Sequence, residues 1–159
     1  MYILRKFRKK EKGKYPFRFI QGIDYTEVEH SQYKYQMIRD RMAWTDIKGY
    51  EVYTEYFDLY NDGRLVIFSG YAWDGVTSFP DLPSMMRASC VHDVFFQILR
   101  ESLIPDFDRD VFFKISNNEL SRLSKIDGLP WPLYHLAKKA VDIFGYKYAR
   151  KNIKGHKNV

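Results

Sequence analysis

The sequence predicts an α+β fold, in which an N-terminal antiparallel β-meander is followed by three helices packed as a C-terminal helical half. Aromatic and β-branched residues alternate in the first half, a strong hairpin turn follows them, and apolar residues recur at helical spacing in the second half. The chain has 159 residues, of which 45% are hydrophobic, so it can bury one real core. We expect a flexible basic arm over residues 1–14 and a single α+β domain over residues 15–159.

The expected strands lie before residue 70. Residues 33–38 alternate in polarity and predict a short strand, and the aromatic and β-branched residues 50–60 predict a long one. Asn61-Asp62-Gly63 favours a tight turn, because Asn, Asp and Gly tolerate positive φ. The chain then returns as a partner strand over residues 65–68.

Three helices are expected after the strands. Ser84 can cap the first, which runs to about Glu101, and the second covers about residues 107–125 and ends at Asp127-Gly128. The last helix covers about residues 132–151. Its apolar residues recur at helical spacing, namely Leu133, Leu136, Ala137, Ala140, Val141, Phe144 and Tyr148.

The net charge of +6 is concentrated at the two ends of the chain. Residues 1–14 and residues 138–159 each carry seven basic side chains against one acidic side chain, so residues 15–137 hold 12 basic and 18 acidic ones. Basic ends of this kind can bind nucleic acid, anionic lipid or an acidic partner surface, and they are equally consistent with solubility alone. An acidic body would repel a phosphate backbone, which makes nucleic acid the weaker of these expectations.

The compartment is inferred from features that the chain lacks. Cys90 is the single cysteine, so no internal disulfide can form, and a cytoplasmic origin is the simple interpretation. No apolar run approaches the roughly 20 residues of a membrane span. No apolar segment follows the basic N-terminus, so we expect no secretory signal.

The helix around His92 carries the first candidate functional residues. On a helical wheel His92 falls at the edge of the apolar face, Asp93 falls well outside it, and Phe96 lies one turn beyond His92. A histidine held there can act as a base near neutral pH. The alternative is a structural histidine bonded to one buried carbonyl, with Asp93 solvated. Cys90 points about 200° away from His92 on the same wheel, so the two side chains cannot form a catalytic dyad, and we interpret Cys90 as structural.

Two acidic segments flank this helix. The loop at residues 70–81 offers Asp74, Asp81, hydroxyls and carbonyls, which are the oxygen ligands that Ca²⁺ prefers. The alternative is a turn in which Asp74 and Ser78 bond nearby amides. The second segment contains Asp106, Asp108 and Asp110, where acids at a helix N-terminus are favoured without any function.

Five motifs follow one another along the chain, namely Gly70-Tyr71, Asp74-Gly75-Val76-Thr77-Ser78, Ala88 with His92-Asp93, Asp110 with Phe113, and Val141-Asp142-Ile143-Phe144-Gly145. Their order resembles a family of phage and prophage proteins grouped as domain of unknown function 1353. The resemblance spans about residues 33–148. It departs from the family pattern at Thr77, Phe96 and Arg109, and the ionisable positions are intact. It implies a phage or prophage origin, in the virion or the host cytoplasm, with no established activity.

Residues 73–113 are also similar to phospholipase A2, especially its small bacterial forms. This resemblance implies that His92 is the base for a water molecule and that Asp110 orients it. It implies that Asp93 and the carbonyls of Trp73 and Gly75, with Asp74 beside them, hold a Ca²⁺ ion that stabilises the oxyanion. Phe96 replaces the usual tyrosine, and the disulfides of the animal enzymes are absent.

Two functions therefore stay open at the level of sequence. One is a phage or prophage-derived accessory or virion-associated protein, bound through its basic ends to a phage structural protein or an anionic surface. The other is a calcium-dependent lipid or ester hydrolase. Both place the working site in a cleft between the loop at residues 73–81 and the helices that carry His92 and Asp110, with Ser78 and Arg87 as further members.

Overall fold

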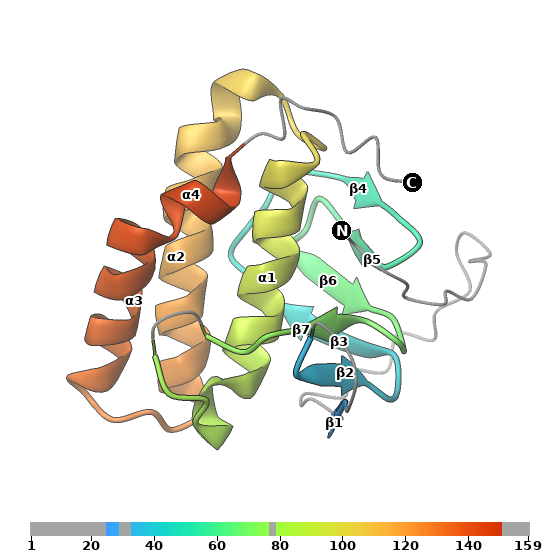
Figure 1. Ribbon diagram of the computed structural model, residues 1–159. Coiled ribbons are helices and arrows are strands. Elements are labelled where there is room, and N and C mark those ends of the chain that lie inside the picture. The colour runs from blue at the N-terminus through green and yellow to red at the C-terminus, as the bar shows by residue number, and fades with distance from the viewer. Residues whose placement is uncertain (1–24, 29–32, 77–78, 151–159) are drawn as a thin grey trace. The chain divides into compact units, whose positions relative to one another are not determined.

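The computed structural model describes residues 25–28, 33–76 and 79–150, and Figure 1 shows their elements. The chain divides into two compact units, residues 2–74 and residues 75–159. The described part of the first unit is built from antiparallel strands and that of the second from helices, which confirms the α+β class. The predicted arm over residues 1–14 lies outside the described residues. The prediction of a single domain over residues 15–159 stays a prediction.

The first unit ends in a strand of a three-stranded sheet. This sheet consists of β1 (Tyr25–Glu27), β2 (Tyr35–Met37) and β7 (Ala72–Trp73) in the order β1-β2-β7, with Tyr35 paired to Trp73. The Trp73 side chain is fully buried, and its ring lies 5.8 Å from that of Tyr25 and 5.5 Å from that of Tyr35. Aromatic packing of this kind fixes the strand from which the loop at residue 74 departs.

The second sheet contains the predicted meander. Its strands β3 (Arg41–Trp44), β4 (Val52–Tyr53), β5 (Phe57–Leu59) and β6 (Arg64–Ile67) have the order β3-β6-β5-β4 and pair antiparallel. The hairpin turn before β6 is confirmed, because Gly63 has a φ of 93° and Asp62 Oδ1 accepts a hydrogen bond from the Arg64 amide at 3.1 Å. The predicted strands at residues 33–38 and 65–68 are confirmed as β2 and β6, with shifted bounds.

The prediction of one long strand over residues 50–60 is wrong. The segment folds back on itself, so that β4 and β5 pair with each other. Thr54 makes the reversal, because its hydroxyl accepts hydrogen bonds from the amides of Tyr56 at 3.0 Å and Phe57 at 2.9 Å. A threonine side chain can replace a backbone partner in this way, and strand propensity alone does not reveal it.

The helices make up the described part of the second unit. In chain order they are η1 (Pro83–Met85), α1 (Met86–Arg100), η2 (Asp106–Asp108), α2 (Arg109–Ile126), α3 (Leu133–Phe144) and α4 (Tyr146–Ala149). In Figure 1, α2 lies between α1 and α3, and α4 packs on α1 and α3. The predicted end of the second helix is confirmed, with Asp127 at the C-cap and Gly128 at a φ of 94°. Ser84 lies inside η1 and does not cap α1, whose N-cap residue is Met85.

The predicted last helix is interrupted at Gly145. Its described part forms α3 and the short α4 in place of one continuous helix. A Cβ atom at position 145 would collide with the Val141 carbonyl oxygen and would lie 3.0 Å from two ring atoms of Phe96. The absence of a side chain at Gly145 therefore lets α1 approach the junction closely. Within α3 the side chains of Ala137 and Val141 are buried, whereas Leu136 and Phe144 are exposed.

No helix within the described ranges is long and apolar enough to cross a membrane.

Candidate functional site

His92 is buried inside the helical unit and held by a side chain of the facing helix. It lies on α1, is 8% exposed, and its Nε2 atom is 2.8 Å from Oδ1 of Asn117 on α2. The Asn117 amide nitrogen donates to Asp142 Oδ1 at 2.8 Å, so the amide oxygen is the atom that faces the ring. An amide oxygen only accepts, and this orientation therefore places the imidazole proton on Nε2.

The hydrogen bonds continue from Asn117 to the outside of α3. Asp142 accepts from Asn117 through one carboxylate oxygen and from Lys138 Nζ through the other, at 2.6 Å. His92, Asn117, Asp142 and Lys138 thus form a polar chain that ties α1, α2 and α3 together. Its inner end is buried and its outer end is solvated, which is the arrangement that stabilises a polar residue among packed helices.

The pKa of His92 is lowered to about 4, chiefly because burial penalises the charged imidazolium. The hydrogen bond to Asn117 and the carboxylates of Asp93 and Asp142 act in the opposite direction, and the Arg100 charge lowers the pKa further. The ring is therefore neutral at pH 7 and accepts a proton only in strongly acidic solution.

Aromatic rings connect His92 to the far end of the helical unit. The His92 and Phe96 ring centroids are 4.0 Å apart, Phe96 stacks on Phe113 at 5.6 Å, and Phe113 meets Tyr146 edge to face at 5.9 Å. Phe96, which stands where both resembled families have tyrosine, thus fills the space between α1 and α2 with apolar surface. The column of rings ends at a pocket.

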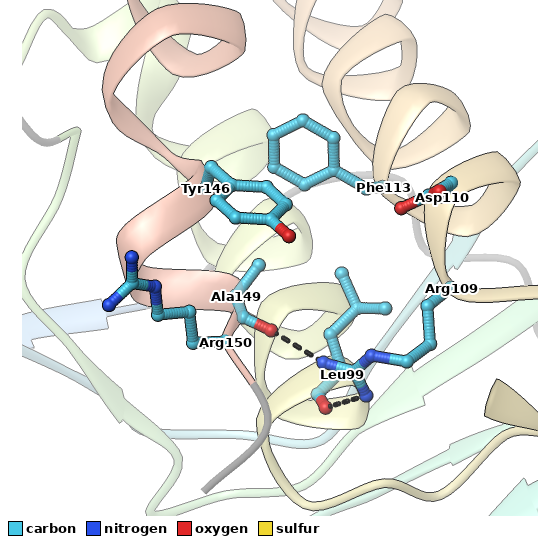
Figure 2. A pocket seen from close by; sticks show the side chains of 7 residues that line it. All are labelled: Leu99, Arg109, Asp110, Phe113, Tyr146, Ala149 and Arg150. Carbon is cyan, nitrogen blue, oxygen red and sulfur yellow. Dashed lines mark hydrogen bonds between the residues drawn. The ribbon is translucent and has the colours of Figure 1, made fainter.

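The pocket has a volume of about 340 Å³ and is drawn in Figure 2. Arg109 shapes its wall, because its two terminal nitrogens donate to the carbonyl oxygens of Leu99 at 2.6 Å and Ala149 at 2.8 Å. Figure 2 shows the Asp110 carboxylate on the side of Phe113 and the Arg150 side chain pointing away from the other residues. The lining residues are Leu99, Arg109, Asp110, Phe113, Tyr146, Ala149 and Arg150.

Asp110 is exposed at the first turn of α2, so the structure places it at the pocket. It precedes Asn117 by seven residues, which is about 10 Å along a helix axis. The side chain that forms a hydrogen bond with the His92 ring is Asn117. The phospholipase resemblance assigns this orienting role to Asp110.

Arg87 forms an ion pair with Asp127. Its guanidinium donates to both carboxylate oxygens of Asp127, at 2.9 Å and 2.7 Å. The pair ties the first turn of α1 to the C-terminal end of α2, and the Arg87 side chain is almost wholly buried. Bidentate geometry and burial indicate a structural clamp at this candidate site residue.

Asp81 closes the loop that contains Gly75. Gly75 has a φ of 81°, and Asp81 Oδ1 accepts a hydrogen bond from the Val76 amide at 3.0 Å. The Asp81 carboxylate occupies the place where a Cβ atom on residue 75 would lie, so only glycine fits there. The candidate site residue Ser78 lies outside the described residues.

The predicted calcium ligands are distributed over both units. Trp73 and Asp74 belong to the first unit, and Gly75 and Asp93 belong to the second. The Trp73 carbonyl accepts the Lys34 amide at 3.2 Å, as a strand residue does. Within the described ranges, no group of three or more His, Cys, Asp or Glu side chains could hold a metal ion. The calcium site and the shared cleft stay predictions.

Asn117 and Asp142 are the site residues that sequence reasoning missed. A signal for Asn117 exists, because it falls beside the buried Leu120 and Ser124 on the α2 wheel, where a polar side chain requires a partner. Asp142 offers no such signal, because a charged residue on the polar face of an amphipathic helix is ordinarily solvated.

Comparison of the chain with protein-family models, with curated proteins and with solved structures gives no match.

Proposed function

We propose that this chain is a phage or prophage-derived accessory or virion-associated protein that works by binding and assembly, with His92 in a structural role. The environment of His92 favours this role over catalysis. The side chain is buried within a polar chain that joins three helices, and its pKa is about 4. The phage origin rests on the order of motifs along the sequence alone.

A general base is most effective when its pKa lies near the working pH. The ring of His92 is a weak base by that criterion, since its pKa is about 4. Its partner is the neutral amide of Asn117, which orients the ring but supplies no negative charge to an imidazolium. The same contacts are well suited to holding α1, α2 and α3 in register.

The proposed partners are a phage structural protein or an anionic surface, contacted through the basic ends of the chain. Seven of the last 22 residues are Lys or Arg and one is Asp, so this end attracts acidic surfaces. Nucleic acid is the weaker candidate, because residues 15–137 carry a net charge of −6.

A calcium-dependent lipid or ester hydrolase is the second candidate. The observation in its favour is the tautomer of His92: the proton lies on Nε2, which leaves Nδ1 as the basic atom of a neutral ring. A water-activating histidine needs such an arrangement. Asp93 is the neighbouring carboxylate that would take Ca²⁺ in this hypothesis.

Two measurements on the full chain separate the candidates. The first asks whether the protein co-sediments with purified phage particles or binds a component of them, and we expect that it does. The second follows hydrolysis of a fluorogenic phospholipid in Ca²⁺ or in EDTA, where we expect no calcium-dependent turnover. The matched variants are His92→Gln and His135→Gln, since His135 is an exposed histidine of the same unit.

Calcium-dependent turnover that is lost in His92→Gln and retained in His135→Gln would establish the hydrolase and refute a structural role for His92. If the protein neither enters particles nor binds any phage component, the assembly role fails.

A further inference from the structure

Helix α3 leaves a stripe of apolar side chains uncovered. Leu136 is 51% exposed and Ile143 is 59% exposed, and the half-buried Ala140 lies between them. Positions 136, 140 and 143 share one face of a helix, so these three residues form a continuous strip, called here the α3 stripe. A strip of this kind, outside the core, requires a physical explanation.

The core contact of α3 lies on a different part of its surface. Ala137 and Val141 are buried, and α3 packs on α2 and α4. Figure 1 shows α3 at the edge of the helical bundle, with α2 between it and α1. The α3 stripe therefore lies beside the buried face of α3. It extends the apolar surface of this helix past the residues that pack in the core.

Exposed aromatic residues flank the stripe along the chain on both sides. Trp131 precedes α3, and Phe144, Tyr146 and Tyr148 follow the stripe at its C-terminal end, all four with large exposed fractions. Tryptophan and tyrosine rings suit the boundary between water and lipid, because they combine apolar area with a polar atom.

The charge around the stripe is positive. Residues 131–150 contain four basic side chains and one acidic side chain, Asp142, which is paired with Lys138. Lys139 borders the stripe on the helical wheel, and Lys147 lies over the Tyr148 ring at 4.8 Å from its centroid. Apolar and aromatic side chains flanked by lysines are typical of helices that lie on anionic membranes.

We propose that the α3 stripe, with the lysines beside it, binds an anionic phospholipid surface, with α3 parallel to the membrane plane. The stripe enters the interfacial region, the lysine stems extend along the apolar surface, and their ammonium groups meet lipid phosphates and carboxylates. This inference specifies the anionic surface of the proposed binding role. It does not depend on the phage origin, because vesicle binding is measured without any phage component.

The test measures co-sedimentation of the full chain with vesicles of phosphatidylcholine alone and of phosphatidylcholine mixed with phosphatidylserine. We expect binding to the mixed vesicles that weakens as salt is raised. The double variant Leu136→Ser/Ile143→Ser keeps every charge and should bind at least about 10-fold more weakly. Lys139→Gln and Lys147→Gln should each cost about 5-fold.

Ile126→Ser is the matched control for the single stripe variant Ile143→Ser, because each replaces one exposed isoleucine. Ile126 belongs to α2 and is 56% exposed, close to the value for Ile143, so its replacement removes a similar apolar area elsewhere. We expect vesicle binding by this control to equal that of the original chain. Thermal melting of each variant confirms folding, and Ile143→Ser alone is compared with this control if the double variant melts early.

Several outcomes would overturn the proposal. Unchanged vesicle binding in the stripe variant would mean that basic charge alone attracts the protein to lipid. Failure of the original chain to bind mixed vesicles would contradict the proposal directly while leaving the assembly role untouched. A dimer of the original chain that becomes monomeric in the stripe variant, with vesicle binding unchanged, would assign the stripe to contact between copies.

Discussion

Nε2 of His92 lies 2.8 Å from Oδ1 of Asn117, and this single contact joins the middle of α1 to the middle of α2. The amide nitrogen of Asn117 donates a hydrogen bond to Asp142 on α3, so this one side chain connects three helices. Side-chain networks that are fully paired rigidify a core, whereas the loss of a central member leaves several groups unsatisfied at once. We therefore expect stability to be sensitive to a change at Asn117.

Asn117→Ala should destabilise the protein by about 2–3 kcal/mol, because it leaves the buried Nε2–H of His92 without its acceptor and removes one of the hydrogen bonds that Asp142 accepts. Asn118→Ala is the matched control, since residue 118 is exposed on the same helix and should change stability by less than about 0.5 kcal/mol. Urea unfolding followed by circular dichroism measures both. Equal stability of the two variants would contradict a central role for Asn117.

Stability should fall as the pH is lowered from about 6.5 to about 4, in part because of His92. The folded protein holds the pKa of this ring near 4, below its ordinary value of 6.5, so the unfolded chain binds more protons across that window. Stability then rises with pH through the window, and the full contribution is about 3 kcal/mol. His92→Gln should flatten this part of the profile of unfolding free energy against pH, whereas a profile as steep as that of the original chain would count against the lowered pKa.

Local sequence patterns predicted the elements whose signals are short in range. The Asn61-Asp62-Gly63 turn and the end of α2 at Asp127-Gly128 are both correct, because each depends on local turn or capping chemistry. The break at Gly145 depends on the approach of Phe96 from another helix, and the reversal at Thr54 depends on one side-chain hydroxyl. Neither is visible in periodicity.

The candidate site was predicted less completely than the fold. The wheel placed His92 at the edge of the apolar face, whereas the structure buries it, because α1 is covered on nearly all sides. Helical spacing also cannot identify a hydrogen-bond partner on another helix. Asn117 and Asp142 are far from His92 in sequence, and helix packing alone brings them together. The pairing of the buried Arg87 side chain with Asp127 at the end of another helix has the same origin.

The Arg87–Asp127 pair should behave as a structural unit. Arg87→Met should cost about 2 kcal/mol, because a carboxylate that is partly buried loses both of its hydrogen bonds. Arg87→Lys should recover only part of this loss, since an ammonium group cannot reproduce the bidentate contact. The double variant Arg87→Met/Asp127→Leu should be more stable than Arg87→Met. Strict additivity of the single variants in a double-mutant cycle would show that the pair is not coupled.

Gly75→Ala should be more damaging than Gly128→Ala. Both glycines have positive φ, at 81° and 94°, so each alanine pays about 1 kcal/mol of backbone strain. At position 128 nothing lies within 4 Å of the added Cβ atom, whereas at position 75 the Asp81 carboxylate occupies its place. The alanine at 75 must also expel Asp81 and break its hydrogen bond to the Val76 amide, which adds about 1 kcal/mol or more. Thermal melting of the two variants gives the comparison, and Gly75→Ala should cost little beyond backbone strain in an Asp81→Ala background. A full-sized loss in that background would place the origin of the effect outside the contact with Asp81.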